Sequence, residues 1–261
     1  MFLLYRRMSK STKISIITVS FNSAKTIKDT IESIISQNYN NIEYLIIDGG
    51  SLDGTIDIAK KYSNHIEYIV SDSDNGIYDA MNKGIKAATG DIIGILNSDD
   101  FYPNSEIISN VAKIFSKSEC DCLYGDLVYV NKRDRQKIVR YWKSGDFSIS
   151  KLENGWTLPH PTFFVRKSVY DEYGLYNTDF KTASDYEMIL RLLYKNKLKV
   201  AYFPEVMVNM RIGGESNRSF WNRLRANQED GLAWTYNKLN KPMFIRIKKP
   251  LQKLKQFFLK P

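Results

Sequence analysis

The sequence predicts an α/β protein with a doubly wound, mostly parallel sheet that carries helices on both faces. Two observations support this fold class. Short apolar runs rich in Ile and Val alternate with segments of helical periodicity, and a polar cluster follows each apolar run. With 261 residues and 43% hydrophobic content, the chain is long enough to bury a substantial core.

The first half is predicted to contain four strands. They cover residues 13–21, 42–47, 66–70 and 91–97. Between them we expect one helix capped by Asn22 and Ser23, a second after Thr55 and a third over 77–89 that ends at Gly90. Ile27, Ile31, Ile34 and Ile35 give the first of these helices one apolar face.

The second half shows a looser pattern. We expect a helix over 104–117, a strand over 121–130, a polar hairpin tip over 132–137, a helix from Ser184 and a strand over 200–203. Cys120 and Cys122 have no second cysteine pair with which to form a zinc site, so they are predicted to be core residues.

Asp99 and Asp100 stand at the carboxyl end of the fourth predicted strand. In an open α/β sheet that edge binds ligands, and carboxylate oxygens suit a manganese or magnesium ion that carries phosphates. The alternative interpretation is that the Ser98–Asp100 segment only caps the following helix.

Polar segments follow all four strands, at Thr18–Asn22, Asp48–Thr55, Asp74–Gly84 and Leu96–Asp100, and are predicted to converge on one cleft. In combination, these motifs resemble those of glycosyltransferase family 2, the inverting GT-A type that uses nucleotide-activated sugars. The resemblance covers about residues 12–217 and implies a Rossmann-like GT-A fold.

The resemblance assigns the nucleotide-binding residues. Asp48 resembles the residue that accepts a hydrogen bond from the base, and an acceptor-only carboxylate suits the N–H of uracil. The other residues that the resemblance places near the nucleotide are Thr18, Ser20, Asn22, Asp74, Asn82 and Lys83. The alternatives are an Asx-type turn for Asp48, caps for the strand-end residues Thr18, Ser20 and Asn22, and a solvated helix face for Asp74, Asn82 and Lys83.

The metal site departs from the commonest family pattern, because Asn97 stands where the first carboxylate of Asp-X-Asp is expected. Asn97 can offer a carbonyl oxygen to the substrate but no charge. Binding the metal would therefore fall to Asp99 and Asp100, with one of them on the metal and the other on the metal or the ribose. The ion would offset the charge that develops on the departing diphosphate.

The resemblance also implies a general base and a mobile loop. Asp185 matches the acidic residue at a helix start that deprotonates the acceptor hydroxyl, with Glu187 as fallback and a helix cap as the alternative role of Asp185. From its position before a strand-like run, His160 could contact the acceptor or the diphosphate, and a structural role is the alternative. Arg211, in the loop 210–217, could pair with the diphosphate, unless that loop is a plain connection.

The net charge of +9 lies at the two ends of the chain. Residues 1–10 and 241–261 together hold +10, which leaves −1 for residues 11–240. This distribution argues against a nucleic-acid-binding protein. We expect a basic extension over 1–11, a catalytic domain over 12–217 with halves at 12–103 and 104–217, and a helical basic region over 218–261.

The last residues form a basic amphipathic pattern. Its apolar residues are Phe244, Ile247, Leu251, Leu254 and Phe258. Residues 241–261 are predicted to bind an anionic membrane surface, with packing on the catalytic domain as the alternative. No apolar run approaches the roughly 18 residues that span a bilayer, and the first residues do not fit a secretory signal. The expected location is cytoplasmic, on the inner face of the membrane.

The resemblance implies transfer of a hexose, Glc or Gal, from a UDP-sugar to a hydroxyl of a lipid-diphosphate-linked saccharide, as in O-antigen or capsule assembly. One alternative is a nucleotidyltransferase, but the first strand is not followed by a Gly-rich loop with Lys or Arg. A second alternative is a catalytically inactive sugar-nucleotide-binding scaffold at the membrane, suggested by Asn97 and the basic tail.

Overall fold

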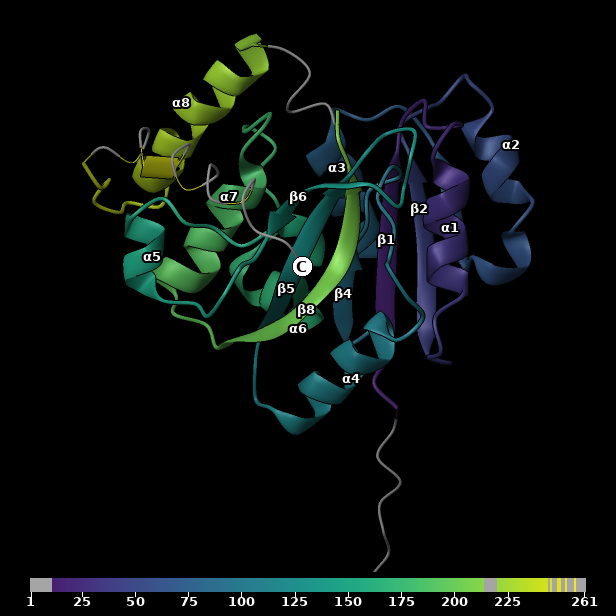
Figure 1. Cartoon of the computed structure of the whole chain (residues 1–261), viewed down its shortest axis with the longest axis horizontal. Helices are drawn as coiled ribbons and strands as arrows, with labels where there is room; N and C mark the ends of the chain where they lie inside the picture. The colour runs from purple at the N-terminus through teal and green to yellow at the C-terminus, as the bar shows by residue number, and fades with distance from the viewer. Residues whose placement is uncertain are drawn as a thin grey trace, which may run out of the picture.

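The computed structural model describes residues 11–213, 220–243, 245, 248, 249, 252 and 256, and nothing is described of the side chains of 220–224. This part of the chain forms an eight-stranded sheet with helices on both faces (Figure 1). The strands are β1 (Ile14–Ser20), β2 (Ile42–Asp48), β3 (Tyr68–Ser71), β4 (Ile92–Ile95), β5 (Cys122–Val130), β6 (Ile138–Trp142), β7 (Phe164–Arg166) and β8 (Val200–Arg211). The predicted α/β fold class is confirmed.

The strand order is β3-β2-β1-β4-β7-β5-β6, and β8 pairs with β5. Strands β1 to β4 are parallel, and β8 is parallel to β5. The short strand β7 is antiparallel to both β4 and β5 and so joins the two halves of the chain in one sheet. With three residues, β7 is too short to leave a periodic pattern in the sequence.

Strand β8 is longer than the predicted 200–203. It continues past Pro204 because a bulge lets the pairing resume, from Gly125 with Phe203 to Asp126 with Val206. Proline cannot donate to the ladder, so the sequence pattern indicated an end at this point. The predicted hairpin tip over 132–137 is confirmed, since it joins the antiparallel strands β5 and β6.

The helices are α1 (Ile27–Ile35), α2 (Thr55–Lys60), α3 (Ile77–Ala87), α4 (Ile107–Lys117), α5 (Ile149–Glu153), α6 (Lys167–Tyr173), α7 (Ser184–Ile189) and α8 (Phe220–Tyr236). Short 3₁₀ turns cover Ser63–His65 and His160–Thr162, and a π-helix over Leu190–Lys195 continues α7. Helix α1 begins at Ile27, after a turn over 23–26, so Asn22 and Ser23 do not cap it as predicted.

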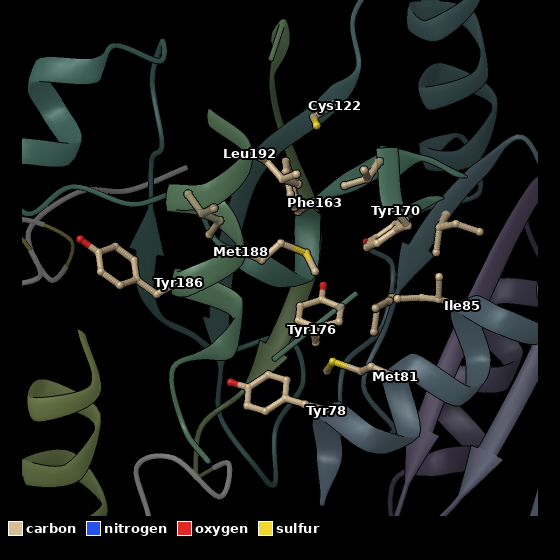
Figure 2. Close-up of a cluster of buried hydrophobic side chains, with 14 of the residues drawn as sticks. Tyr78, Met81, Ile85, Cys122, Phe163, Tyr170, Tyr176, Tyr186, Met188 and Leu192 are labelled. Carbon is tan, nitrogen blue, oxygen red and sulfur yellow. The ribbon is translucent and has the colours of Figure 1, made fainter. Parts of the chain in front are cut away.

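Two apolar cores pack on the sheet. One contains side chains of α1 and α4, and the other contains side chains of α3, α6 and α7. In the second core, Met81 and Ile85 of α3 face Tyr176 and Met188 (Figure 2). Helix α3 therefore packs against the elements of the second half. Cys120 and Cys122 are free and buried, as predicted.

Three described residues of the basic tail, Ile245, Lys248 and Lys249, contact the protein body, whereas Lys241 and Met243 are exposed. Ile245 is 2% exposed, and Lys249 Nζ lies 2.5 Å from Asp230 Oδ1 and 3.5 Å from the centre of the Tyr186 ring. Lys248 Nζ donates to Asn154 Oδ1 at 2.9 Å. The rest of the tail pattern and residues 1–10 lie outside the described part of the chain. Within that part, no helix combines the length and apolarity needed to cross a membrane.

Candidate active site

The carboxyl ends of β1, β2 and β3 meet at one residue, Asp48. In the parallel register, Ser20 and Ser71 are the neighbours of Asp48 on the two flanking strands. Both hydroxyls donate to its carboxylate, at 2.8 Å from Ser20 and 2.7 Å from Ser71. The backbone N–H groups of Gly50 and Ser51 and the hydroxyl of Ser51 complete five hydrogen bonds at 2.6 to 3.1 Å.

This arrangement sets the charge of Asp48. Burial alone would raise its pKa, but the hydrogen bonds from Ser51, Ser71 and Ser20 outweigh burial, so the pKa lies below the ordinary value. Asp48 is therefore an ionised carboxylate that organises the turn after β2. The Asx-type turn, the alternative role from the sequence, is present in the structure.

Thr18 is not at this edge. Its side chain is fully buried, and its hydroxyl accepts a hydrogen bond from Tyr44 at 3.1 Å. Asn22 is exposed in the left-handed region, with φ of 49°, and it holds the turn after β2: its N–H donates to Ser51 Oγ and its Oδ1 accepts from Leu52 N–H. Ser20 thus bonds Asp48 directly and Asn22 bonds the turn that follows it, while Thr18 does neither.

Asp74 reaches the same edge across Gly49. A side chain at position 49 would put its Cβ only 2.6 Å from Asp74 Oδ2 and 3.4 Å from the ring of Phe21. Glycine therefore lets the Asp74 carboxylate lie directly against the backbone here. Phe21 is 64% exposed beside these groups. The sequence pattern predicts only that Phe21 ends a strand, although an exposed aromatic residue at a candidate ligand-binding edge is itself a binding candidate.

Asn82 and Lys83 differ in their placement. The side chain of Asn82 is buried and exchanges two hydrogen bonds with the backbone of Tyr176, at 2.8 and 2.9 Å, so it joins α3 to the second half. Lys83 is more open: its Nζ donates to the carbonyl of Ser73 at 3.2 Å, next to Asp74. The structure brings Lys83 near the predicted nucleotide residues, and Asn82 is a structural link.

Asp99 and Asp100 follow β4, and neither caps α4, which begins seven residues later at Ile107. Burial raises the pKa of Asp99. Burial and the neighbouring charge of Asp99 raise the pKa of Asp100 well above the ordinary value. Among the described residues, Asp100 Oδ1 and Asn97 Oδ1 are buried and find no hydrogen-bond partner.

Arg211 at the end of β8 is linked to this loop. Its guanidinium donates to the carbonyl of Asp99 at 2.6 Å and to the carboxylate of Asp29 on α1, and it lies 4.9 Å from the centre of the Phe101 ring. Arg135 of the β5–β6 hairpin pairs with the same Asp29 at 2.7 Å. The family resemblance implied that Arg211 could pair with the diphosphate. It gave no sign of these contacts, because they join residues far apart in the sequence. Residues 214–217 of its predicted loop lie outside the described part.

The residues after β4 fit a divalent cation. Two buried oxygens without partners in the described structure and two neighbouring carboxylates with raised pKa values form a set of hard oxygen ligands. Asp99 and Asp100, with the carbonyl oxygen of Asn97, would hold the ion. No cluster of three or more His, Cys, Asp or Glu side chains suited to a metal occurs in the described part, so the substrate phosphates would supply further ligands.

Asp185 stands in the first turn of α7. Its Oδ1 accepts a hydrogen bond from the hydroxyl of Tyr78 at 3.1 Å. Tyr78 is the second residue of α3, and Asp74 accepts from Gly76 N–H just before this helix at 2.8 Å. The short segment from Asp74 to Tyr78 therefore contacts both the candidate base and the residues around Gly49.

His160 lies in a buried aromatic group beside Asp185. Its Nε2 is 2.7 Å from the hydroxyl of Tyr176, whose ring stacks on Tyr78 at 5.7 Å (Figure 2). Burial lowers the pKa of His160, although the charge of Asp185 opposes this. The imidazole is therefore neutral at neutral pH. The alternative base Glu187 has no exposed surface and is bonded to Arg191 and Asn237, so it is a core residue.

The family model of glycosyl transferase family 2 matches residues 15–174, which include the strand-end residues up to His160. The chain belongs to glycosyltransferase family 2. A PGL/p-HBAD biosynthesis glycosyltransferase of Mycobacterium bovis is 29% identical over 208 residues, covering 78% of each chain.

Two solved structures share the fold of this glycosyltransferase. Staphylococcus aureus TarS in complex with UDP-GlcNAc has a TM-score of 0.68 and 18% identity, covering 88% of this chain and 68% of that one. A mannosyltransferase of Pyrobaculum calidifontis, in complex with GDP-Man and Mn²⁺, has a TM-score of 0.67 and 16% identity, covering 96% and 71%. The predicted GT-A fold is confirmed by these likenesses.

The hydrogen bonds of Asp48 yield a prediction about stability. Asp48→Asn should lower the free energy of unfolding at pH 7 by about 3 kcal/mol, because an amide cannot accept all five hydrogen bonds. A lowered pKa stabilises the fold above the unfolded value, near 3.8, and this stabilisation is lost as the pH falls through the folded pKa. The difference between wild type and variant should therefore shrink below pH 3.8.

Urea unfolding at a series of pH values measures this difference. Asp57→Asn, at an exposed position in α2, is the matched control and should change stability little. A loss that is equal at neutral and acid pH would mean that the charge of Asp48 has no part in holding the strand ends.

Proposed function

We propose that this enzyme inverts configuration as it transfers a hexose, Glc or Gal, from a UDP-sugar to a hydroxyl of a lipid-diphosphate-linked saccharide. The product would belong to a surface polysaccharide such as O antigen or capsule. The observation that carries the proposal is the Tyr78–Asp185 hydrogen bond, which brings a carboxylate of the second half to the first turn of α3. The TarS structure with bound UDP-GlcNAc supports the choice of donor class.

The donor would lie along the ends of β1, β2 and β4. Ser20 and Asp74 contact Gly49, which follows Asp48, and the exposed ring of Phe21 offers a face on which a nucleobase can stack. Asp48 already accepts five hydrogen bonds, two of them from Ser20 and Ser71. Hydroxyl groups can rotate, so either serine can release an acceptor position to an N–H of the base.

Asp185 would act as the general base. It takes the proton of the acceptor hydroxyl, and the acceptor oxygen forms a bond to the anomeric carbon on the face opposite the diphosphate. The bond between that carbon and the diphosphate oxygen breaks, and UDP leaves with the electron pair. One base suffices for this direct displacement. Tyr78 would hold the carboxylate in place through its hydrogen bond.

Asp99, Asp100 and Asn97 would hold manganese or magnesium on the departing diphosphate. When bound, the ion offsets the negative charge that develops there. The Mn²⁺ in the Pyrobaculum calidifontis mannosyltransferase supports this assignment. Arg211 adds a fixed positive charge beside the loop and lowers the pKa of both carboxyl groups, against burial, which raises them.

Residues 241–261 would attach the enzyme to the inner face of the membrane, where a lipid-linked acceptor is found. The proposal rests on the excess of basic residues, which an anionic surface attracts. Lys248 and Lys249 are already engaged with the body. The attraction therefore depends on the remaining basic residues of the tail.

The metal proposal predicts that Asp99→Ala and Asp100→Ala each abolish transfer, and that excess chelator abolishes transfer by the wild type, since the diphosphate would lose its counter-charge. Release of UDP from a panel of UDP-sugars is the measurement, and manganese added back in excess should restore the wild type. Undiminished activity in chelator would refute the metal requirement. Release of pyrophosphate would indicate a nucleotidyltransferase.

The base proposal predicts that Asp185→Asn lowers turnover about a hundredfold or more while the affinity for the donor stays nearly unchanged, because only the proton acceptor is removed. Single-turnover kinetics and donor titration separate the two effects. Tyr78→Phe keeps the ring and removes the hydrogen bond, so it should slow turnover less. A collapse of donor affinity with normal turnover would show that Asp185 is a nucleotide contact.

The membrane proposal predicts that phosphatidylglycerol vesicles sediment the protein at low salt and release it at high salt. Changing Lys241, Arg246, Lys253, Lys255 and Lys260 to Gln should weaken binding at least about tenfold, since each basic residue contributes about 1 kcal/mol near such a surface. The control variant changes five lysines that are exposed on the body to Gln. They are Lys25, Lys60, Lys61, Lys113 and Lys117, so the control variant has the same net charge as the tail variant. Equal loss in both variants would contradict a specific role of the tail.

A further inference from the structure

The start of α7 is held by a carboxylate from a distant helix. Glu229 of α8 accepts hydrogen bonds from the backbone N–H groups of Lys181 (3.2 Å), Thr182 (2.7 Å) and Ala183 (3.0 Å). The Thr182 hydroxyl donates to the same carboxylate at 2.9 Å. These partners lie 46 to 48 residues before Glu229 in the chain, and Glu229 is only 9% exposed.

The residues at the start of α7 itself do not cap the helix. Ala183 occupies the capping position, and no side chain of this segment caps the helix. Ser184 Oγ is buried and has no hydrogen-bond partner in the described structure. Serine and aspartate commonly fill this role locally. Glu229 instead holds the three backbone N–H groups that lead into the helix, and the carboxylate of Asp185, the second residue of α7, meets Tyr78.

Further contacts fix α8 against α7. Trp234 Nε1 donates to the Tyr186 hydroxyl at 3.1 Å, and Asn237 Nδ2 donates to Glu187 Oε1 at 3.1 Å. Lys249 lies over the ring of Tyr186 and pairs with Asp230, the neighbour of Glu229. The family match ends at residue 174, so these contacts come from the part of the chain beyond it.

We propose that Glu229 is a positioning residue for glycosyl transfer. By fixing the backbone of residues 181–183, it sets the direction in which Asp185 leaves α7. The inference rests on the proposed role of Asp185 as the base. It makes α8 a functional part of the acceptor side of the enzyme, because Glu229 acts on the reaction only through the orientation of the base.

The test compares Glu229→Gln with Gln228→Ala, a matched control at an exposed position on the same helix. Glutamine keeps the size of the side chain but places an N–H₂ donor against backbone donors. We expect turnover to fall about tenfold to a hundredfold, as a misplaced catalytic group does, with the donor dissociation constant unchanged. Gln228→Ala should match the wild type. Thr182→Val removes only one of the four hydrogen bonds and should cause a smaller loss.

A double-variant cycle with Asp185→Asn isolates the mechanism. If Glu229 acts through the base, Asp185→Asn with Glu229→Gln should be no slower than Asp185→Asn alone. Multiplied losses, weakened donor binding, or a loss of turnover that matches a loss of folded protein by circular dichroism would overturn the positioning role. If Glu229→Gln fails to fold, the Thr182→Val cycle decides the question by the same criteria.

The outcomes also separate this inference from the function on which it rests. Full turnover in Asp185→Asn would refute the proposed base, and the role of Glu229 would fall with it. Full turnover in Glu229→Gln beside a slow Asp185→Asn would refute the role of Glu229 alone.

Discussion

The burial of one ionised carboxylate, Asp48, is the constraint on which the ligand-binding edge of the sheet depends. A charge removed from water costs several kcal/mol unless hydrogen bonds replace its hydration. Asp48 obtains them from Ser20, Ser51 and Ser71, which lie after or at the ends of three neighbouring strands. The need to satisfy this charge therefore aligns β1, β2 and β3. It also fixes the turn that contains Gly49, against which Asp74 and Phe21 pack.

The carboxylates at the end of β4, unlike Asp48, are not fully satisfied by hydrogen bonds among the described residues. Asp99 and Asp100 lie side by side with raised pKa values, and buried oxygens of Asn97 and Asp100 have no partner within the described structure. Native proteins leave few such groups unsatisfied, and a bound ion is one of the partners that completes them. Arg211 relieves part of the repulsion and pairs with Asp29 on α1. Arg211 thus holds the loop after β4 in place, while Asn97 Oδ1 and Asp100 Oδ1 keep no hydrogen-bond partner in the described structure.

The strand-end clusters and helix periodicity were enough to predict the α/β fold and the convergence of Ser20, Asp48 and Asp74, because these depend on local patterns. Local patterns could not predict which face of a fully buried strand a residue occupies. Thr18 therefore proved to be a core residue bonded to Tyr44, and Asn82 a partner of the Tyr176 backbone. The pairing of Arg211 with Asp29 and of Glu229 with residues 181–183 joins segments far apart in the chain. No spacing rule reports such pairs.

Helix α3 shows why the predicted halves of the catalytic domain are not mechanically separate. Its sequence belongs to the first half, and Asp74 and Gly76 form the turn that leads into it beside Gly49. Its side chains bond to the second half, Tyr78 to Asp185 and Asn82 to the backbone of Tyr176. A displacement of this helix would therefore move both the contact to Asp185, the proposed base, and the turn near the proposed nucleotide residues. Since α8 also contacts α7, the orientation of Asp185 depends on two helices from different parts of the chain.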